Sequence, residues 1–345
     1  MKAFRPVISF LSALLGGVSA VLACTSAIIG GGASASGRML LWKHRDTGAE
    51  HSFVARVKPC RSGELEYVAL FNGGDSLLRE AWTGVNAAGF AVMNTASYNL
   101  APDTARVRDR EGVVMARALA VCRNVADFDS LLRVLPRPMG VQANFGAIDT
   151  CGAGAYFETC DTGFVRVDLA HRDTMIVRTN YSHCGEADGG YGYIREASAV
   201  KLLEPMVASR SVAPERIFTE VSRSFYHSLL GYDPVAADTA AVWIVDQDFI
   251  PRYSTGACVV IEVPAGGDDP SGAVMWSALG YPPCAEMRRA TLDSIDTGLL
   301  PAAPLWRAPL SERAAKLKGE VFPIRRGSGS HYIYLPALRG MLKKD

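Results

Sequence analysis

The chain has 345 residues, of which 49% are hydrophobic and 21% charged, and its formal net charge at pH 7 is +1. A composition this apolar excludes an intrinsically disordered chain and is typical of a globular protein with a large core. A net charge near zero gives no electrostatic basis for binding nucleic acid, so we expect no nucleic-acid partner.

The first segment, residues 1–23, has the parts of a secretory signal peptide. Lys2 and Arg5 precede an apolar stretch that is too short to be a good membrane-spanning helix, and Ala23 has the small side chain that suits a cleavage site. Cleavage after Ala23 would make Cys24 the first residue of an exported protein, either periplasmic or secreted. No later apolar run is long enough to span a membrane, so we expect no transmembrane helix in the mature chain.

Cys24 admits two interpretations. As a first residue it would carry both a thiol and a free α-amine, the nucleophile and base of N-terminal-nucleophile hydrolases. The run from Val21 to Cys24 also resembles a bacterial lipobox, in which the cysteine is acylated, anchors a lipoprotein and does no chemistry. Lipoproteins usually continue with a polar linker, whereas residues 25–29 are typical of a strand. This favours the catalytic interpretation and leaves the lipid anchor as the alternative.

A hairpin is predicted directly after Cys24. Strands over residues 25–29 and 39–42 flank a glycine-rich turn, which lacks the residue order of a phosphate-binding loop. The charged run that follows, from Lys43 to Asp46, could be a solvated strand end. Because the hairpin would return this run to Cys24, we expect Lys43 and Asp46 at the active site instead.

The remaining elements follow from hydrophobic periodicity and turn residues. Further strands are predicted over residues 53–57, 66–72, 80–85, 90–94, 145–148, 155–158, 164–168, 175–178, 243–246, 258–263 and 274–278. Helices are predicted over residues 111–134, 194–208 and 214–230, with Asp127 as a cap that would divide the first of them into two.

This order of elements predicts an α+β fold in a single domain over residues 24–345. Two antiparallel sheets would pack together with helices outside them, as a four-layer αββα sandwich. The last part, residues 312–345, has eight Lys or Arg against three acidic residues and is predicted as a basic, solvated covering segment.

The cysteines and histidines suggest no metal site. The eight cysteines are Cys24, Cys60, Cys122, Cys151, Cys160, Cys184, Cys258 and Cys284. An exported chain could pair several of them, but seven remain without Cys24, so at least one more should be free. There is no CxxC pair and His183-Cys184 has no partner at zinc spacing, so we expect no metal and no other cofactor. His44 and His183 would suit a Cys–His protease, but an N-terminal nucleophile needs no histidine.

Cys24-Thr25-Ser26, the hairpin and Lys43-x-x-Asp46 together resemble the start of the choloylglycine hydrolase and penicillin V acylase group. The isopenicillin N acyltransferase-like enzymes and related cysteine dipeptidases share that start. The resemblance implies the Ntn-hydrolase fold. The group's hairpin typically ends Gly-Arg-Asn-x-Asp, with the Arg and the Asp in the site. Here Asp46 matches, and Lys43, a candidate substrate-binding residue, keeps the charge of the arginine but not its planar fork.

Later motifs extend the resemblance to about residues 24–200. The turn at residues 84–90 resembles one that precedes a strand ending in an oxyanion-binding asparagine, which implies this role for Asn94. The segment around Asn180 resembles the one that holds a second catalytic asparagine, and Arg195 is placed near the group's later catalytic arginine.

The resemblance implies an exported amidohydrolase or acyltransferase that cleaves a linear non-protein amide or a short peptide. The thiol of Cys24 would attack the carbonyl, and its α-amine would carry the proton. Asp46 would orient the ammonium, Asn94 and Asn180 would donate to the oxyanion, and Arg195 would organise the site electrostatically. Acyl β-lactams, bile-acid conjugates, N-acyl amino acids, acyl-homoserine lactones and dipeptides remain open as substrates. The sequence does not decide whether water or an amine accepts the acyl group, or whether the protein forms a homo-oligomer. The alternative is a lipid-anchored binding or structural protein on the same fold.

Overall fold

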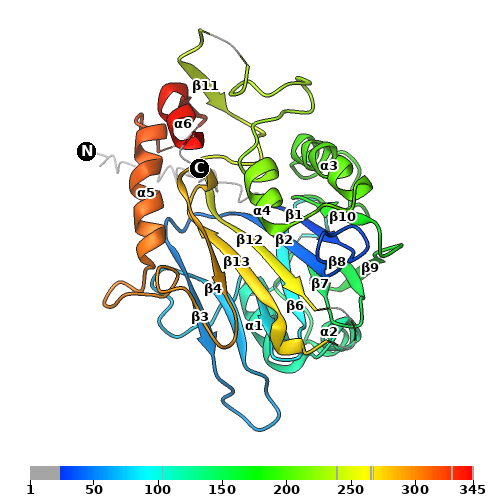
Figure 1. Ribbon diagram of the computed structural model, residues 1–345. Coiled ribbons are helices and arrows are strands. Elements are labelled where there is room, and N and C mark those ends of the chain that lie inside the picture. The colour runs from blue at the N-terminus through cyan, green and yellow to red at the C-terminus, as the bar shows by residue number, and fades with distance from the viewer. Residues whose placement is uncertain are drawn as a thin grey trace, which may run out of the picture.

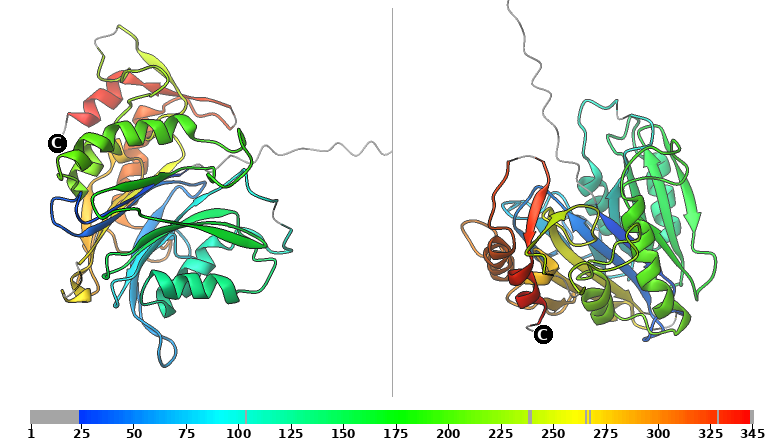
Figure 2. Two further views of the ribbon diagram at one scale, coloured as in Figure 1. Left: turned by 90° about the vertical axis from the view of Figure 1, so that its right-hand side faces the viewer. Right: turned by 90° about the horizontal axis from the view of Figure 1, so that it is seen from above.

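Two antiparallel sheets lie face to face in the computed structural model, with helices on both outer sides (Figures 1 and 2). The structure describes residues 24–343 except 103, 238, 239, 265, 267 and 328. The predicted leader, residues 1–23, lies outside the described residues.

The first sheet has six strands and contains the predicted hairpin at its centre. In spatial order its strands are β10 (Met175–Arg178), β1 (Thr25–Ile29), β2 (Met39–Asp46), β12 (Thr255–Val263), β13 (Val274–Leu279) and β14 (Met287–Ala290). Every residue of β1, β2 and β12 is buried, including the polar run from Lys43 to Asp46 at the end of β2. The start of β1 and the end of β2 therefore lie inside the molecule.

The second sheet has seven strands, each paired with the next along the chain. They are β3 (Ser52–Val57), β4 (Tyr67–Asn72), β5 (Thr83–Asn86), β6 (Ala91–Ala96), β7 (Ala143–Ile148), β8 (Gly154–Cys160) and β9 (Gly163–Asp168). Helices α1 (Glu111–Val121) and α2 (Val125–Val134) connect β6 to β7 and cover the outer face of this sheet.

The order of the layers is visible in the left view of Figure 2. One core cluster joins α1 and α2 to the second sheet and the second sheet to the inner face of the first. Another cluster packs the outer face of the first sheet, including Trp42, against α3 (Tyr193–Ala208) and the turns of helix over α4 (Pro214–Arg216) and Ile217–Val221. The predicted α+β class and four-layer αββα arrangement are confirmed.

Two helix predictions need correction. Helix α2 is capped by Asn124, whose Oδ1 accepts from the Asp127 amide, and not by Asp127 itself. The helix predicted over residues 214–230 ends at Val221. The apolar residues as far as Phe225 are buried, but Leu229 and Leu230 are exposed. The carboxylate of Asp233 accepts from the amide of Phe225 and so replaces a helical hydrogen bond.

The basic C-terminal segment carries exposed charged residues, as predicted, and also contributes apolar side chains to a third core cluster. It forms α5 (Pro309–Val321), β15 (His331–Tyr334) and α6 (Leu335–Leu342), and β15 pairs with β11 (Trp243–Asp246). Apolar side chains such as Phe322, Ile333 and Leu338 are buried in this core, while the charged residues Arg313, Lys316 and Glu320 of α5 are exposed. Short 3-10 turns at Pro270–Gly272 and Pro282–Cys284 complete the elements. Within the described ranges no helix is both long and apolar enough to cross a membrane.

Candidate active site

The hairpin brings Cys24 and Asp46 together, as the sequence predicts. In its register Thr25 faces His44 and Ser26 faces Lys43, so Cys24 lies beside the end of β2. The thiol of Cys24 donates to the backbone carbonyl oxygen of Asp46 at 3.7 Å. Because this contact joins the ends of adjacent antiparallel strands, it follows directly from the turn between them.

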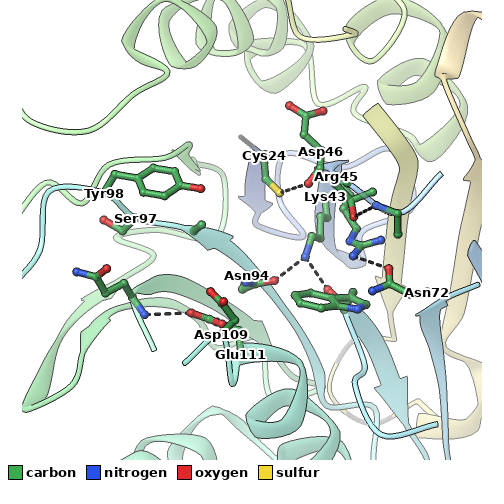
Figure 3. A pocket seen from close by; sticks show the side chains of 16 residues that line it. Cys24, Lys43, Arg45, Asp46, Asn72, Asn94, Ser97, Tyr98, Asp109 and Glu111 are labelled. Carbon is green, nitrogen blue, oxygen red and sulfur yellow. Dashed lines mark hydrogen bonds between the residues drawn. The ribbon is translucent and has the colours of Figure 1, made fainter. Parts of the chain in front are cut away.

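The thiol opens onto a cavity of about 370 Å³, a volume suited to a small organic substrate. Figure 3 shows Cys24 above Lys43 and Asn94, with further polar side chains on both sides. The cavity is lined by Cys24, Lys43, Arg45, Asp46, Thr47, Gly48, Ala49, Asn72, Trp82, Asn94, Ala96, Ser97, Tyr98, Asp109, Glu111 and Gln142. Three of the predicted catalytic residues, Cys24, Asp46 and Asn94, therefore line one cavity together with Lys43, the candidate substrate-binding residue.

Side chains alternate between the two faces of β2. The ammonium of Lys43 and the guanidinium of Arg45 lie on the side of the second sheet, where both contact the ring of Trp82. His44 and the Asp46 carboxylate lie on the other side, with Thr255. All four are buried, so the interpretation of this run as a solvated strand end is excluded.

Lys43 holds the amide of Asn94. Its ammonium nitrogen lies 2.6 Å from Asn94 Oδ1 and 2.7 Å from the carbonyl oxygen of Trp82. Burial lowers the pKa of Lys43 to about 7, against a smaller opposing effect of Cys24. Because the Asn94 oxygen accepts from Lys43, the amide nitrogen points away from Lys43 and is the group that can donate to a ligand of the cavity that Asn94 lines. Lys43 thus orients the donor that the resemblance assigns to the oxyanion.

Replacing Asn94 by alanine is expected to lower kcat for amide hydrolysis by about a hundredfold or more, as loss of one oxyanion donor does. KM should change little, because the donor acts mainly on the charge that develops in the transition state. Steady-state kinetics measure both. An Asn94→Ala variant with unchanged kcat would assign the oxyanion contact to another residue, and Asn99→Ala, outside the cavity lining, serves as the control.

The Asp46 carboxylate is held by residues from a distant part of the chain. Its Oδ2 lies 2.7 Å from Arg252 Nε, and its Oδ1 lies 2.7 Å from the hydroxyl of Thr255. That hydroxyl is also 3.1 Å from His44 Nε2. These two hydrogen bonds fix the direction of the carboxylate. The predicted role of Asp46 toward the α-ammonium of Cys24 stays a prediction.

Asp246 fixes the loop that presents Arg252. Its Oδ2 accepts from the Tyr253 amide at 2.7 Å, and its Oδ1 is buried without a hydrogen-bond partner in the described part of the chain. Burial raises the pKa of Asp246 to about 7, against smaller opposing effects of the Tyr253 amide and Arg252.

A raised acid pKa makes stability depend on pH. Between the ordinary value of 3.8 and about 7 the folded state binds more protons at Asp246 than the unfolded state, so the free energy of unfolding falls as pH rises through this range. Asp246→Asn should therefore remove part of that fall and stabilise the protein more at pH 8 than at pH 4. Thermal melts at both values test this, and an equal effect at both would contradict the raised pKa.

Arg195 and Asn180 form a buried network beneath Cys24. One guanidinium nitrogen of Arg195 lies 2.6 Å from the Cys24 carbonyl oxygen and 2.9 Å from Thr25 Oγ1, and the other lies 2.8 Å from Asn180 Oδ1. The amide of Asn180 donates to the carbonyl of Ala96 at 2.8 Å. Neither residue lines the cavity. The network fixes the backbone of Cys24, while the catalytic roles given to both residues stay predictions.

Neither histidine lies where a base for the thiol would lie. His44 is buried, and burial lowers its pKa to about 4. His183 is half exposed and bonds Glu196 at 2.9 Å. Both are absent from the residues that line the cavity.

The cysteines and potential metal ligands of the described residues add no further chemistry. All eight cysteines are free thiols in this structure, so none of the disulfides that an exported chain could form is present. Across the same residues no group of three or more His, Cys, Asp or Glu side chains is arranged to hold a metal ion.

The sequence interpretation missed several site residues. Arg45 could have been found, because it is two residues from Lys43 on a predicted strand and therefore faces the same side. Arg252 and Thr255 carry no local signal, since only the pairing of β12 with β2 brings them to Asp46. Trp82 precedes β5 and reaches the cavity only through the packing of the two sheets.

Searches against protein-family models and curated proteins found no match. Among solved structures, a mutant conjugated bile acid hydrolase from Clostridium perfringens is 10% identical, covering 79% of this chain and 93% of its own, with a TM-score of 0.49. A Caenorhabditis elegans N-acylethanolamine-hydrolyzing acid amidase ortholog is 14% identical, covering 71% and 95%, with a TM-score of 0.46. Penicillin V acylase from Agrobacterium tumefaciens is 14% identical, covering 79% and 87%, with a TM-score of 0.45.

A conjugated bile acid hydrolase and a penicillin V acylase are among these neighbours, and the sequence resembles the choloylglycine hydrolase and penicillin V acylase group. The identities are low and the TM-scores are below 0.5. The fold assignment therefore rests on the sheet order and the layers of this chain, and the chemistry rests on its own site.

Proposed function

We propose that the protein is an exported amidohydrolase or acyltransferase that cleaves a linear non-protein amide or a short peptide. The observation that carries this proposal is the position of Cys24. Its thiol borders the cavity that also contains Asn94, and it directly precedes a fully buried central strand. A nucleophile and a candidate oxyanion donor thus share one substrate-sized space.

The proposed reaction uses Cys24 twice. After cleavage following Ala23, the α-amine of Cys24 accepts the thiol proton while Sγ attacks the amide carbonyl carbon. Asn94 stabilises the resulting oxyanion. The carbon–nitrogen bond then breaks, the α-ammonium returns the proton to the leaving amine, and a thioester remains on Cys24. Water or a second amine releases the acyl group and regenerates the thiol.

The burial of Cys24 supports this proposal over the lipid anchor. The residue is 7% exposed, and the strand begins at the next residue without a linker. A diacylglyceryl group on the sulfur would have to extend from inside the cavity to the surface of the protein. A lipid anchor normally needs a flexible segment between the acylated cysteine and the folded chain, and this chain has none there.

A panel of amides tests the activity. The mature protein is incubated with N-acyl amino acids, acyl β-lactams, acyl-homoserine lactones, bile-acid conjugates and dipeptides, and mass spectrometry follows the released acid or amine. We expect turnover of at least one class, lost after treatment with iodoacetamide. Added hydroxylamine or a primary amine separates acyl transfer from hydrolysis. Turnover that survives complete alkylation of Cys24 would refute the proposal.

A further inference from the structure

We propose that Arg45 binds a carboxylate of the substrate, so that the enzyme prefers amides bearing a carboxylate near the scissile bond. This inference rests on the proposed function and narrows its substrate class. The observation behind it is a buried guanidinium in the wall of the Cys24 cavity, with one nitrogen that has no hydrogen-bond partner in the described part of the chain.

Arg45 is held firmly by neutral groups. It is 3% exposed, its Nη2 donates to Asn72 Oδ1 at 2.8 Å, and its guanidinium carbon lies 4.6 Å from the centre of the Trp82 ring. These contacts fix the plane of the guanidinium and leave Nη1 with its hydrogens unused. Such a preorganised fork is the side chain that proteins use for carboxylates.

Two other buried arginines of this chain bond a carboxylate directly. Arg178 is paired with Glu158 at 2.8 Å, and Arg252 is paired with Asp46 at 2.7 Å. Arg45 bonds the neutral oxygen of Asn72 instead, and the carboxylates of Glu80 and Asp46 act on it only through space. A buried guanidinium without a bonded carboxylate is a favourable site for an anionic ligand. The side-chain nitrogen of Lys43 is on the same face of β2 and near the same Trp82 ring, so a second basic group borders the cavity beside Arg45.

Two of the three acidic residues that line the cavity, Asp109 and Glu111, lie away from Arg45, and the carboxylate of the third, Asp46, is bonded to Arg252 and Thr255. In Figure 3 Asp109 and Glu111 are on the far side of Asn94 from Arg45 and Asn72. Glu111 is buried, and its Oε1 accepts from the backbone amide of Gln142 at 3.0 Å. An anionic group on the substrate is therefore repelled at the end of the cavity with Asp109 and Glu111 and attracted at the end with Arg45. This polarity directs the carboxylate toward Arg45 and leaves the opposite end for a neutral or cationic group.

Two matched substrate pairs test the preference. Phenylacetylglycine and phenylacetylglycinamide place the carboxylate or its neutral counterpart on the amine side, and glutaryl and butyryl anilides do so on the acyl side. For at least one pair we expect the mature protein to show a kcat/KM ratio, acid over neutral, of about ten or more. Arg45→Met should bring that ratio to about one, and Arg45→Lys should keep part of it.

The ratio is measured within one sample, so it does not depend on the fraction of a variant that folds. Arg123→Met, an exposed arginine between α1 and α2, is the matched control and should keep the ratio. If Arg45→Met slowed acid and neutral substrates equally, Arg45 would act on the Cys24 thiol and not on the substrate. That result, or a wild-type ratio near one for both pairs, would overturn the inference.

Binding without turnover separates this inference from the proposed function. In Cys24→Ala, calorimetry should detect phenylacetylglycine or glutaryl anilide, with affinity at least about tenfold lower in Cys24→Ala/Arg45→Met. If the wild type cleaved no amide but this difference remained, the proposed function would fail and the carboxylate site would stand. If amides were cleaved and Arg45 affected neither binding nor the ratio, the function would stand and the carboxylate site would fail.

Discussion

Replacing Cys24 by alanine is expected to lower amide turnover by at least about a thousandfold, because no other group can form the thioester. The free energy of unfolding should change by less than about 1 kcal/mol, since the removed sulfur borders a cavity and its contact with the Asp46 carbonyl oxygen is a long one, at 3.7 Å. Kinetics with the best substrate of the panel and a thermal melt measure the two effects separately.

Cys151 provides the matched control for this variant. It is exposed and does not line the cavity, so Cys151→Ala should keep full activity. Turnover by Cys24→Ala within about tenfold of the wild type would leave the thiol without a covalent role. A large loss of stability in Cys24→Ala would instead show that the cysteine is chiefly a structural residue.

A protein that keeps residues 1–23 is expected to be folded and inactive. In the uncleaved chain the nitrogen of Cys24 is an amide without a basic lone pair, so it cannot accept the thiol proton. A form expressed as Met followed by Cys24, and trimmed in the cell, should regain full activity. Comparing the two by turnover and circular dichroism, with intact masses confirmed, measures the effect of the free amine.

Acetylation of the mature amine is the sharper control. It changes one nitrogen and leaves the thiol available to iodoacetamide, so activity should be lost while alkylation persists. Full turnover by the uncleaved protein would place the base elsewhere in the chain. His44 would then be the first histidine to test, because it lies on β2 beside Cys24.

Features carried by neighbouring residues were predictable from the sequence. The hairpin that joins Cys24 to Asp46 follows from two adjacent strands and their glycine-rich turn, and the structure shows it in the expected position. The four layers follow from the order of strands and helices. In both cases the signal lies in short stretches whose geometry is fixed by local backbone preferences.

Features that depend on distant pairing were not predictable. The partners of Asp46 are more than two hundred residues away along the chain, and only the register of β2 with β12 aligns them. The helix predicted beyond Val221 failed for a similar reason, because Asp233 intercepts the Phe225 amide. Hydrophobic periodicity reports that side chains are buried, and it does not report which group satisfies their backbone.

Mass spectrometry of the N-terminal peptide tests the central claim most directly. The peptide is analysed before and after a short, acid-quenched incubation with a substrate from the panel. The account predicts an unmodified peptide that begins at Cys24 and then gains the mass of one acyl group on that cysteine. Active protein that still begins at Met1, a diacylglyceryl group on Cys24, or an acyl group on another residue would contradict it.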